Sequence, residues 1–139
     1  MKESYILVIF SGKGREIRIG ALGDIFFSKG FYLYVGSGMG NTGASTLLNR
    51  VKRHLLNYTE KSIHWHIDYL LADTHSIITK IYLIPSNEPL ECIIAQELSI
   101  IFENFIQNFG SSDCPCISHL FYIENSGTSI QKLLNKHVN

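Results

Sequence analysis

The sequence has no excess of charge of either sign, since 12 lysine and arginine residues are balanced by 12 aspartate and glutamate residues. A formal net charge of zero argues against a protein that binds nucleic acid through bulk electrostatic attraction alone. A local basic patch is still compatible with this balance. Any phosphate-binding surface must therefore come from a few clustered side chains.

Long apolar runs are also missing. No run reaches the roughly 20 residues that a transmembrane helix needs, and no small-residue cleavage site follows the apolar run at residues 5–10. We therefore expect a cytoplasmic protein whose first apolar run is a strand. Neither an internal repeat nor a proline-rich or low-complexity tract divides the chain, so residues 1–139 are expected to form a single domain.

Cysteine is scarce, and its count of three is odd, which does not suit a disulfide framework. Cys114, Cys116 and His119 are close together in the sequence, and Cys92 could complete a zinc site with them. Two alternatives remain open. The cysteines could be buried thiols that pack as small apolar side chains, or Cys92 could form a disulfide with one of the other two.

The rest of the composition is that of an ordinary globular protein, with 45% hydrophobic and 17% charged residues. Apolar runs predict strands at residues 5–10, 31–36, 76–84 and 117–123. Residues 16–20 alternate in polarity and are expected to pair with the strand at 5–10 as a hairpin. Helical spacing predicts helices at residues 38–60, 88–109 and 128–137, and a short helix or irregular link at 64–73. This mixture predicts an α/β or α+β fold, with a small mixed central sheet flanked by helices.

Glycine interrupts the strand at residues 31–36, where the sequence continues as FYLYVGSG. Gly36 and the glycines after it remove side chains ahead of the next helix, so a phosphate could approach the main-chain amides. On that helix, Arg50, Arg53 and His54 share a face about 100° wide. Tyr34 could exchange a proton with a bound phosphate or water. The structural alternatives are a packed Tyr34 and a solvated helix face.

These residues resemble the GIY-YIG endonucleases, and most closely their small stand-alone Uri-type branch. The shared motifs are YVG at residues 34–36, RVKRH at 50–54, HWHIDYLL at 64–71, EC at 91–92 and FGSSDCPCISHLF at 109–121, with Tyr5 in the first strand. The sequence departs from the family pattern in its first motif, which reads SYI. Tyr5 and Tyr34 are also 29 positions apart, whereas family members commonly separate the two tyrosine motifs by a short hairpin.

The resemblance implies metal-assisted hydrolysis of a DNA phosphodiester bond. A helix carboxylate would hold one Mg²⁺ or Mn²⁺ ion, Tyr34 would help to activate water beside Tyr5 and His54, and Arg50 would neutralise phosphate charge. This chemistry depends mainly on positioning and charge stabilisation. The expected partner is DNA, which could be branched, flapped or damaged, and a protein partner or a homodimer could supply specificity.

Two glutamates compete for the role of metal ligand. Glu91 and Glu97 are six residues apart on the predicted helix, which turns them about 240° from one another, so only one can face Tyr34 and Arg50. The EC motif of the Uri-type branch favours Glu91. The glutamate-after-alanine pattern found elsewhere in the superfamily favours Glu97. We prefer Glu91 and keep both candidates.

Further residues are expected to contact the DNA backbone and to give an affinity that falls with salt. They are Gly36, Ser37, Lys52, Arg53, His64 and His66. Two other functions remain open from the sequence. One is a non-catalytic nucleic-acid-binding module on the same fold, and the other is a zinc-stabilised interaction domain built around the cysteines.

Overall fold

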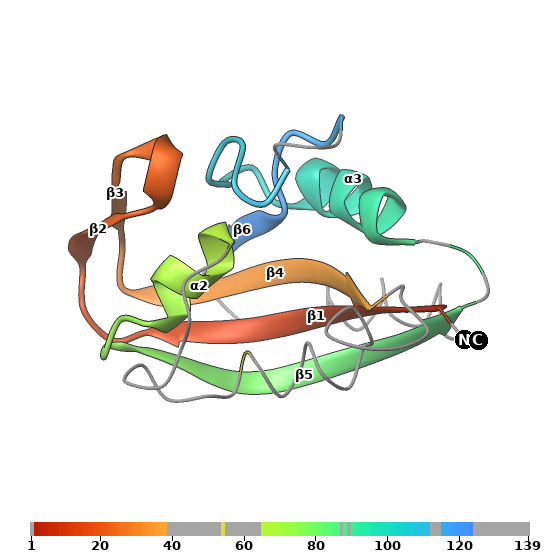
Figure 1. Ribbon diagram of the computed structural model, residues 1–139, viewed down its shortest axis with the longest axis horizontal. Coiled ribbons are helices and arrows are strands. Elements are labelled where there is room, and N and C mark those ends of the chain that lie inside the picture. The colour runs from red at the N-terminus through yellow and green to blue at the C-terminus, as the bar shows by residue number, and fades with distance from the viewer. Residues whose placement is uncertain are drawn as a thin grey trace.

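The computed structural model of the protein describes residues 2–38, 54, 65–86, 88, 90–111 and 115–123 (Figure 1). Its main strands are β1 (Lys2–Ser11), β4 (Gly30–Gly38), β5 (Ser76–Ser86) and β6 (Leu120–Ile123). They form one antiparallel sheet in the order β5-β1-β4-β6. The helices are α2 (His66–Leu71) and α3 (Glu91–Ile101). The predicted combination of a small sheet with flanking helices is confirmed.

Strand β1 lies between β4 and β5, and this position explains its continuous apolar sequence. Residues 5–9 are all buried, because both faces of the central strand are covered. The register pairs Tyr5 with Gly36 and Leu7 with Tyr34. Side chains alternate between the two faces of a strand, so Tyr5, Tyr34 and Gly36 share one face of the sheet.

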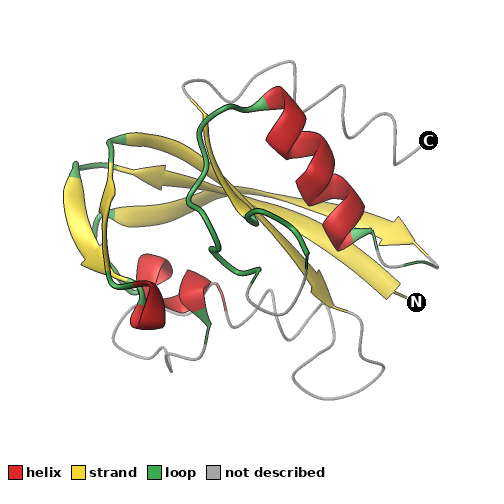
Figure 2. Ribbon diagram, turned by 90° about the horizontal axis from the view of Figure 1, so that it is seen from above, coloured by secondary structure: helices red, strands yellow, loops and turns green. Residues whose placement is uncertain are grey.

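Each face of the sheet carries its own core. The first joins Ile6 and Val8 of β1 to buried residues of α3, which are Ile94, Ala95 and Leu98. The second joins Tyr5 and Leu7 of β1 to buried residues of α2, which are Ile67, Leu70 and Leu71. Figure 2 shows the two helices on either side of the long strands. Tyr34 packs against the second core and therefore lies on the face covered by α2.

A separate hairpin follows β1 and differs from the sequence prediction. Strand β2 (Arg15–Arg18) pairs with β3 (Asp24–Phe27) in a two-stranded sheet, with the short 3-10 helix η1 (Gly20–Leu22) between them. The expectation that residues 16–20 pair with the first strand could not hold, because β4 and β5 already occupy both edges of β1. Residues 24–27, for which the sequence analysis predicted no strand, supply the partner strand instead.

Arg15 fastens this hairpin to the turn after α2. Its Nε and Nη2 lie 2.7 and 2.6 Å from Oδ1 of Asp73, and Nη2 also donates a hydrogen bond to Ser76 at 3.0 Å. Burial raises the pKa of Asp73, but the hydrogen bond from Arg15, the backbone N–H of His75 and nearby positive charge outweigh it, so the net pKa is lowered.

Helix α3 is shorter than the predicted helix at residues 88–109. It ends at Ile101, and Phe102 takes an extended conformation. The chain then runs beside β6: Phe105 bridges to Phe121, Tyr122 donates its N–H to Asn104, and the Ile106 N–H bonds to the strand as well. Pairing along the open edge of β6 outweighs the helical spacing of the apolar residues, because an unpaired strand edge leaves polar backbone groups unsatisfied.

The strands expected at 31–36 and 76–84 lie within β4 and β5, the strand expected at 117–123 begins only at Leu120, and the short helix expected within 64–73 is α2. The helix expected at 128–137 lies outside the described residues. Of the helix expected at 38–60, only Gly38, which ends β4, and His54 are described, so Arg50 cannot be placed. No helix in the described part of the chain is long and apolar enough to cross a membrane.

Candidate active site around Tyr5, His54 and Tyr34

The candidate site begins with the packing of Tyr5 over Gly36. The two residues are paired between neighbouring strands, and a Cβ atom at Gly36 would lie 2.5 Å from the Tyr5 hydroxyl oxygen and closer still to the ring carbon Cζ. No side chain larger than hydrogen fits there without moving the ring. On this face, the space that the sequence interpretation assigned to a phosphate is filled by the Tyr5 ring.

His54 joins the two tyrosines. Its Nε2 forms a 2.7 Å hydrogen bond with the Tyr5 hydroxyl, and both side chains are buried, with Tyr5 1% and His54 3% exposed. The His54 ring also meets the Tyr34 ring edge to face, with centroids 6.1 Å apart. Residues 5, 34 and 54 are thus brought together, as the motif resemblance implies. Of the three, only Tyr34 is partly exposed.

The loop after α3 closes the other side of Tyr34. Phe109 packs edge to face on the tyrosine at 6.3 Å. Gly110 has φ +69°, and a Cβ atom there would lie 3.3 Å from the Tyr34 ring. Both observations favour glycine at this position, because the left-handed backbone and the close ring each disfavour a side chain.

His66 supports this loop from α2. Its Nδ1 accepts a 2.9 Å hydrogen bond from the Gly110 N–H, and its ring lies 5.7 Å from that of Phe109. Burial lowers the pKa of His66 below its ordinary value, which favours the neutral ring. Because Nδ1 is the acceptor, the proton of the neutral ring belongs on Nε2. His66 therefore holds the loop that lines Tyr34.

Glu91 approaches the same loop from the opposite face of the sheet. It is the first residue of α3, and its Oε1 lies 3.3 Å from Nδ1 of His119. The His119 backbone accepts a hydrogen bond from Val35 and donates one to Phe109, at 3.0 and 2.8 Å. Glu91 contacts His119, and Gly110 lies close to both His119 and the Tyr34 ring. Glu91 and Tyr34 therefore flank the same end of β6. The two side chains themselves are on different faces.

Glu97 lies on α3 about 9 Å along the helix axis from Glu91, at a rise of about 1.5 Å per residue. It is partly buried. The contact with His119 brings Glu91 to the loop lining Tyr34. The choice between them as metal ligand stays a prediction.

Several predicted site residues cannot be placed. Arg50, Lys52, Arg53, His64 and Cys114 lie outside the described residues. Ser37 is partly buried in β4 and is paired with Ser4. The predicted DNA contacts of this group stay predictions.

A second group of side chains gathers at the start of α3. Potential ligand atoms of Cys92, Cys116 and His119 all lie within 4.8 Å of one another. Cys92 and Cys116 are not joined by a disulfide. The cluster brings together three of the four residues proposed from the sequence for a zinc site.

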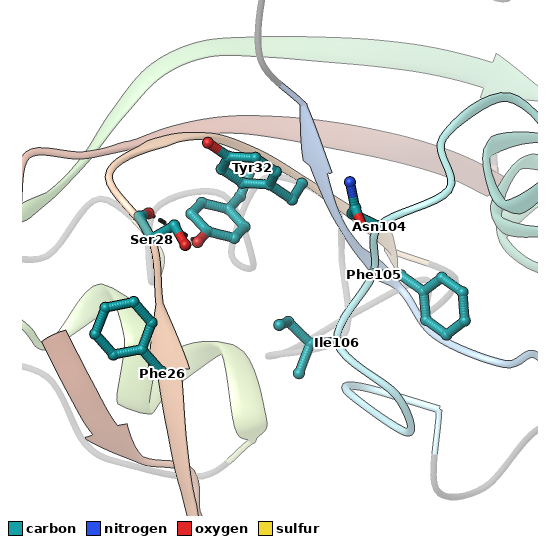
Figure 3. Close-up of a pocket in the computed structure, with 7 residues that line it drawn as sticks. Phe26, Ser28, Tyr32, Asn104, Phe105 and Ile106 are labelled. Carbon is teal, nitrogen blue, oxygen red and sulfur yellow. Dashed lines mark hydrogen bonds between the residues drawn. The ribbon is translucent and has the colours of Figure 1, made fainter. Parts of the chain in front are cut away.

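A surface pocket of about 300 Å³ lies elsewhere, between the β2–β3 hairpin and β6 (Figure 3). The Tyr32 hydroxyl donates a hydrogen bond to the Ser28 carbonyl, and Tyr122 bonds to Lys29 in the same way. None of the predicted site residues lines it. The lining residues are Phe26, Ser28, Tyr32, Asn104, Phe105, Ile106 and Tyr122.

Sequence reasoning missed Gly110, Phe109 and the pairing of Glu91 with His119. The glycine offered a signal, because it stands in the FGSSDCPCISHLF motif directly after the helix predicted at residues 88–109. The pairing of Glu91 with His119 offered none, since the two residues are 28 positions apart and belong to different elements.

Comparison with known proteins identifies one family. A family model described as "Domain of unknown function DUF123" matches residues 4–139. No curated protein and no solved structure matches the chain.

Proposed function

The chain belongs to the DUF123 family, and we propose that it is a divalent-metal-dependent endonuclease that hydrolyses DNA phosphodiester bonds in the manner of the GIY-YIG enzymes. The observation that carries this proposal is the cluster of Tyr5, His54 and Tyr34. Two tyrosines of neighbouring antiparallel strands share one face, and a buried histidine contacts both. The motif resemblance named these three residues independently of their contacts.

Tyr34 is the group that handles the proton of the attacking water in this proposal. Among the three clustered residues, it is the one whose side chain is partly open to solvent. A free phenol has a pKa near 10 and is a poor base at neutral pH. Nearby positive charge must therefore favour its ionised form, and Arg50 is the proposed source.

Tyr5 and His54 act as positioning residues. Tyr5 is 1% exposed, so its hydroxyl does not reach a substrate, and its hydrogen bond instead fixes the ring of His54. His54 in turn packs against the edge of Tyr34. On the other side, Phe109 and Gly110 hold the phenol from the loop. Tyr34 is thereby restricted before substrate binds, which lowers the ordering cost of reaction.

The divalent ion is assigned to Glu91. Because the Glu91 and Tyr34 side chains lie on different faces of the sheet, the phosphate that they would share has to lie at the end of β6 that both of them flank. Its carboxylate is an oxygen ligand of the kind that Mg²⁺ and Mn²⁺ prefer, and its side chain is 25% exposed at the start of α3. Mg²⁺ is commonly held by one or two carboxylates together with substrate phosphate, so a single glutamate is sufficient. When bound, the ion would neutralise charge on the phosphate and favour ionisation of water.

A cleavage screen tests the proposal. Labelled flapped, nicked and linear DNA would be incubated with the protein in Mg²⁺, in Mn²⁺ and in chelator, and DNA binding would be measured in parallel. We expect metal-dependent cleavage of at least one DNA. Tyr34→Phe should reduce the rate by roughly 10²–10⁴-fold, the usual contribution of a general base, while Tyr82→Phe on β5 serves as a matched control. Binding without cleavage of any DNA would instead identify a non-catalytic binding module.

The two glutamates can be separated in the same assay. Glu91→Gln should abolish the stimulation by Mg²⁺, because the amide removes the negative charge that holds the ion. Glu97→Gln, on the same helix, should leave it nearly unchanged. The reverse pattern would assign the ion to Glu97 and would leave the role of Tyr34 intact.

A further inference from the structure

The cluster at the start of α3 points to a second metal site, distinct from the one that hydrolysis requires. Cys92 is the second residue of α3, Cys116 lies in the segment before β6, and His119 immediately precedes that strand. Their potential ligand atoms lie within 4.8 Å of one another. We propose that Cys92, Cys116 and His119 bind a zinc ion.

The donor set favours zinc over the ion of the cleavage reaction. Thiolate sulfur and imidazole nitrogen are ligands that suit zinc, whereas Mg²⁺ and Mn²⁺ prefer oxygen. Zinc binds sulfur at about 2.3 Å and nitrogen at about 2.0–2.1 Å in tetrahedral geometry. Ligand atoms of such a site are about 3.3–3.8 Å apart, as follows from those bond lengths. The observed cluster therefore needs a contraction of only about 1 Å.

Glu91 adds a feature typical of zinc-binding histidines. Its carboxylate lies 3.3 Å from Nδ1 of His119, so in the proposed site Nε2 would be the ring nitrogen that binds the ion. Metal-bound histidines usually donate their other ring N–H to a carboxylate or carbonyl, which fixes the ring and makes it a better ligand. Glu91 is thus the proposed positioning residue for His119 through Oε1, and its other oxygen, Oε2, would be the one that holds the ion of the cleavage reaction. Cys92, Cys116 and His119 supply three of the four ligands that a tetrahedral zinc site takes, and Cys114, the fourth residue predicted from the sequence, lies outside the described residues.

The site would tie the start of α3 to the chain that enters β6. Cys116 is 7% exposed and belongs to the core beneath α3, and the His119 side chain is 2% exposed, so the ion would be largely shielded from solvent. Because a formed site exists only in the folded chain, binding of zinc stabilises the fold. It would also fix His119, which lies between Glu91 and the loop beside Tyr34.

Metal analysis of the intact protein tests this inference independently of DNA cleavage. The protein would be purified without a histidine tag and its zinc content measured. We expect about one zinc per chain, and a marked loss in Cys92→Ser, Cys116→Ser and His119→Asn. His75→Asn, at an exposed histidine in the turn before β5, is the matched control and should keep the metal. Zinc retained in the three ligand variants would overturn the assignment.

A spectroscopic measurement keeps the inference testable if those variants do not fold. Co²⁺ added to metal-free wild-type protein should produce thiolate-to-cobalt charge-transfer absorption, which saturates at one ion per chain and is displaced by Zn²⁺. Absence of this absorption, together with absence of zinc in the purified protein, would show that the cysteines are buried thiols only. A protein that holds zinc but cuts no DNA would refute the proposed function and leave this site standing.

Discussion

Gly36→Ala is the substitution that most sharply separates two roles for the glycine at the end of the YVG motif. If the glycine serves only to admit a phosphate, alanine should weaken cleavage and leave the fold unaffected. If it serves to admit the Tyr5 ring, as the structure shows, alanine should destabilise the protein before any substrate is present.

The magnitude follows from the geometry. A Cβ at Gly36 would lie 2.5 Å from the Tyr5 hydroxyl oxygen, whereas ordinary contact begins near 3.4 Å, so the ring must retreat by about 1 Å. Overpacking of this kind costs about 1–3 kcal/mol. If the ring movement also breaks the buried hydrogen bond to His54, a further cost of about 1–3 kcal/mol is expected.

Urea unfolding of the purified variants would measure this cost. Gly12→Ala is the control, because a Cβ there meets its nearest atoms at 3.6 and 3.7 Å, and its stability should change by no more than about 1 kcal/mol. Tyr5→Leu should remove most of the penalty of Gly36→Ala in a double-mutant cycle. Equal stability of the Gly36 and Gly12 variants would refute the reasoning, since it would mean that Tyr5 does not lie over Gly36.

Three further predictions concern the support of the site and of the hairpin. Asp73→Asn should lower the free energy of unfolding by about 1–2 kcal/mol at neutral pH. Because the pKa of Asp73 is lowered in the folded state, this stability difference should be present above the pKa of the unfolded state and should vanish as pH falls through the folded-state pKa. A difference in the free energy of unfolding that persists in urea at low pH would contradict the prediction. The pKa of His66, measured by NMR, should lie below the ordinary value of 6.5. The stabilisation that neutral His66 provides should be lost as pH falls through that lowered pKa. A titration midpoint at or above 6.5 would contradict the burial of His66. Gly110→Ala should cost about 1–2 kcal/mol through its left-handed backbone and should slow cleavage by displacing Tyr34, whereas unchanged stability and rate would contradict the packing.

The fold could be predicted where the pattern of a single segment is enough to indicate its burial. Residues 5–10 are apolar throughout, and a strand covered on both faces needs that pattern. The hairpin at β2 and β3 could not be predicted, because the choice of partner for residues 16–20 depends on which strands already occupy the edges of β1. The end of α3 was predicted wrongly for the same reason. The helix stops at Ile101 because the residues after it pair with β6, which is distant in the sequence.

The candidate site was predictable to the extent that motifs name residues. Tyr5, Tyr34 and His54 were identified from a resemblance, and the structure brings them into contact across up to 49 positions of sequence. The resemblance could not indicate that the Tyr5 ring packs over Gly36, because this contact depends on the register of two strands. Nor could periodicity place Glu91 opposite His119, since helical spacing describes only one helix at a time.

The most direct test of the central claim is the single-turnover rate at which saturating wild-type protein and its Tyr34→Phe variant cut one DNA in Mg²⁺. We predict a metal-dependent rate that falls by at least roughly 10²-fold in the variant, with the same dissociation constant for DNA. A rate that is equal in the two proteins, or no cleavage by wild type of any DNA offered in Mg²⁺ or Mn²⁺, would contradict the account.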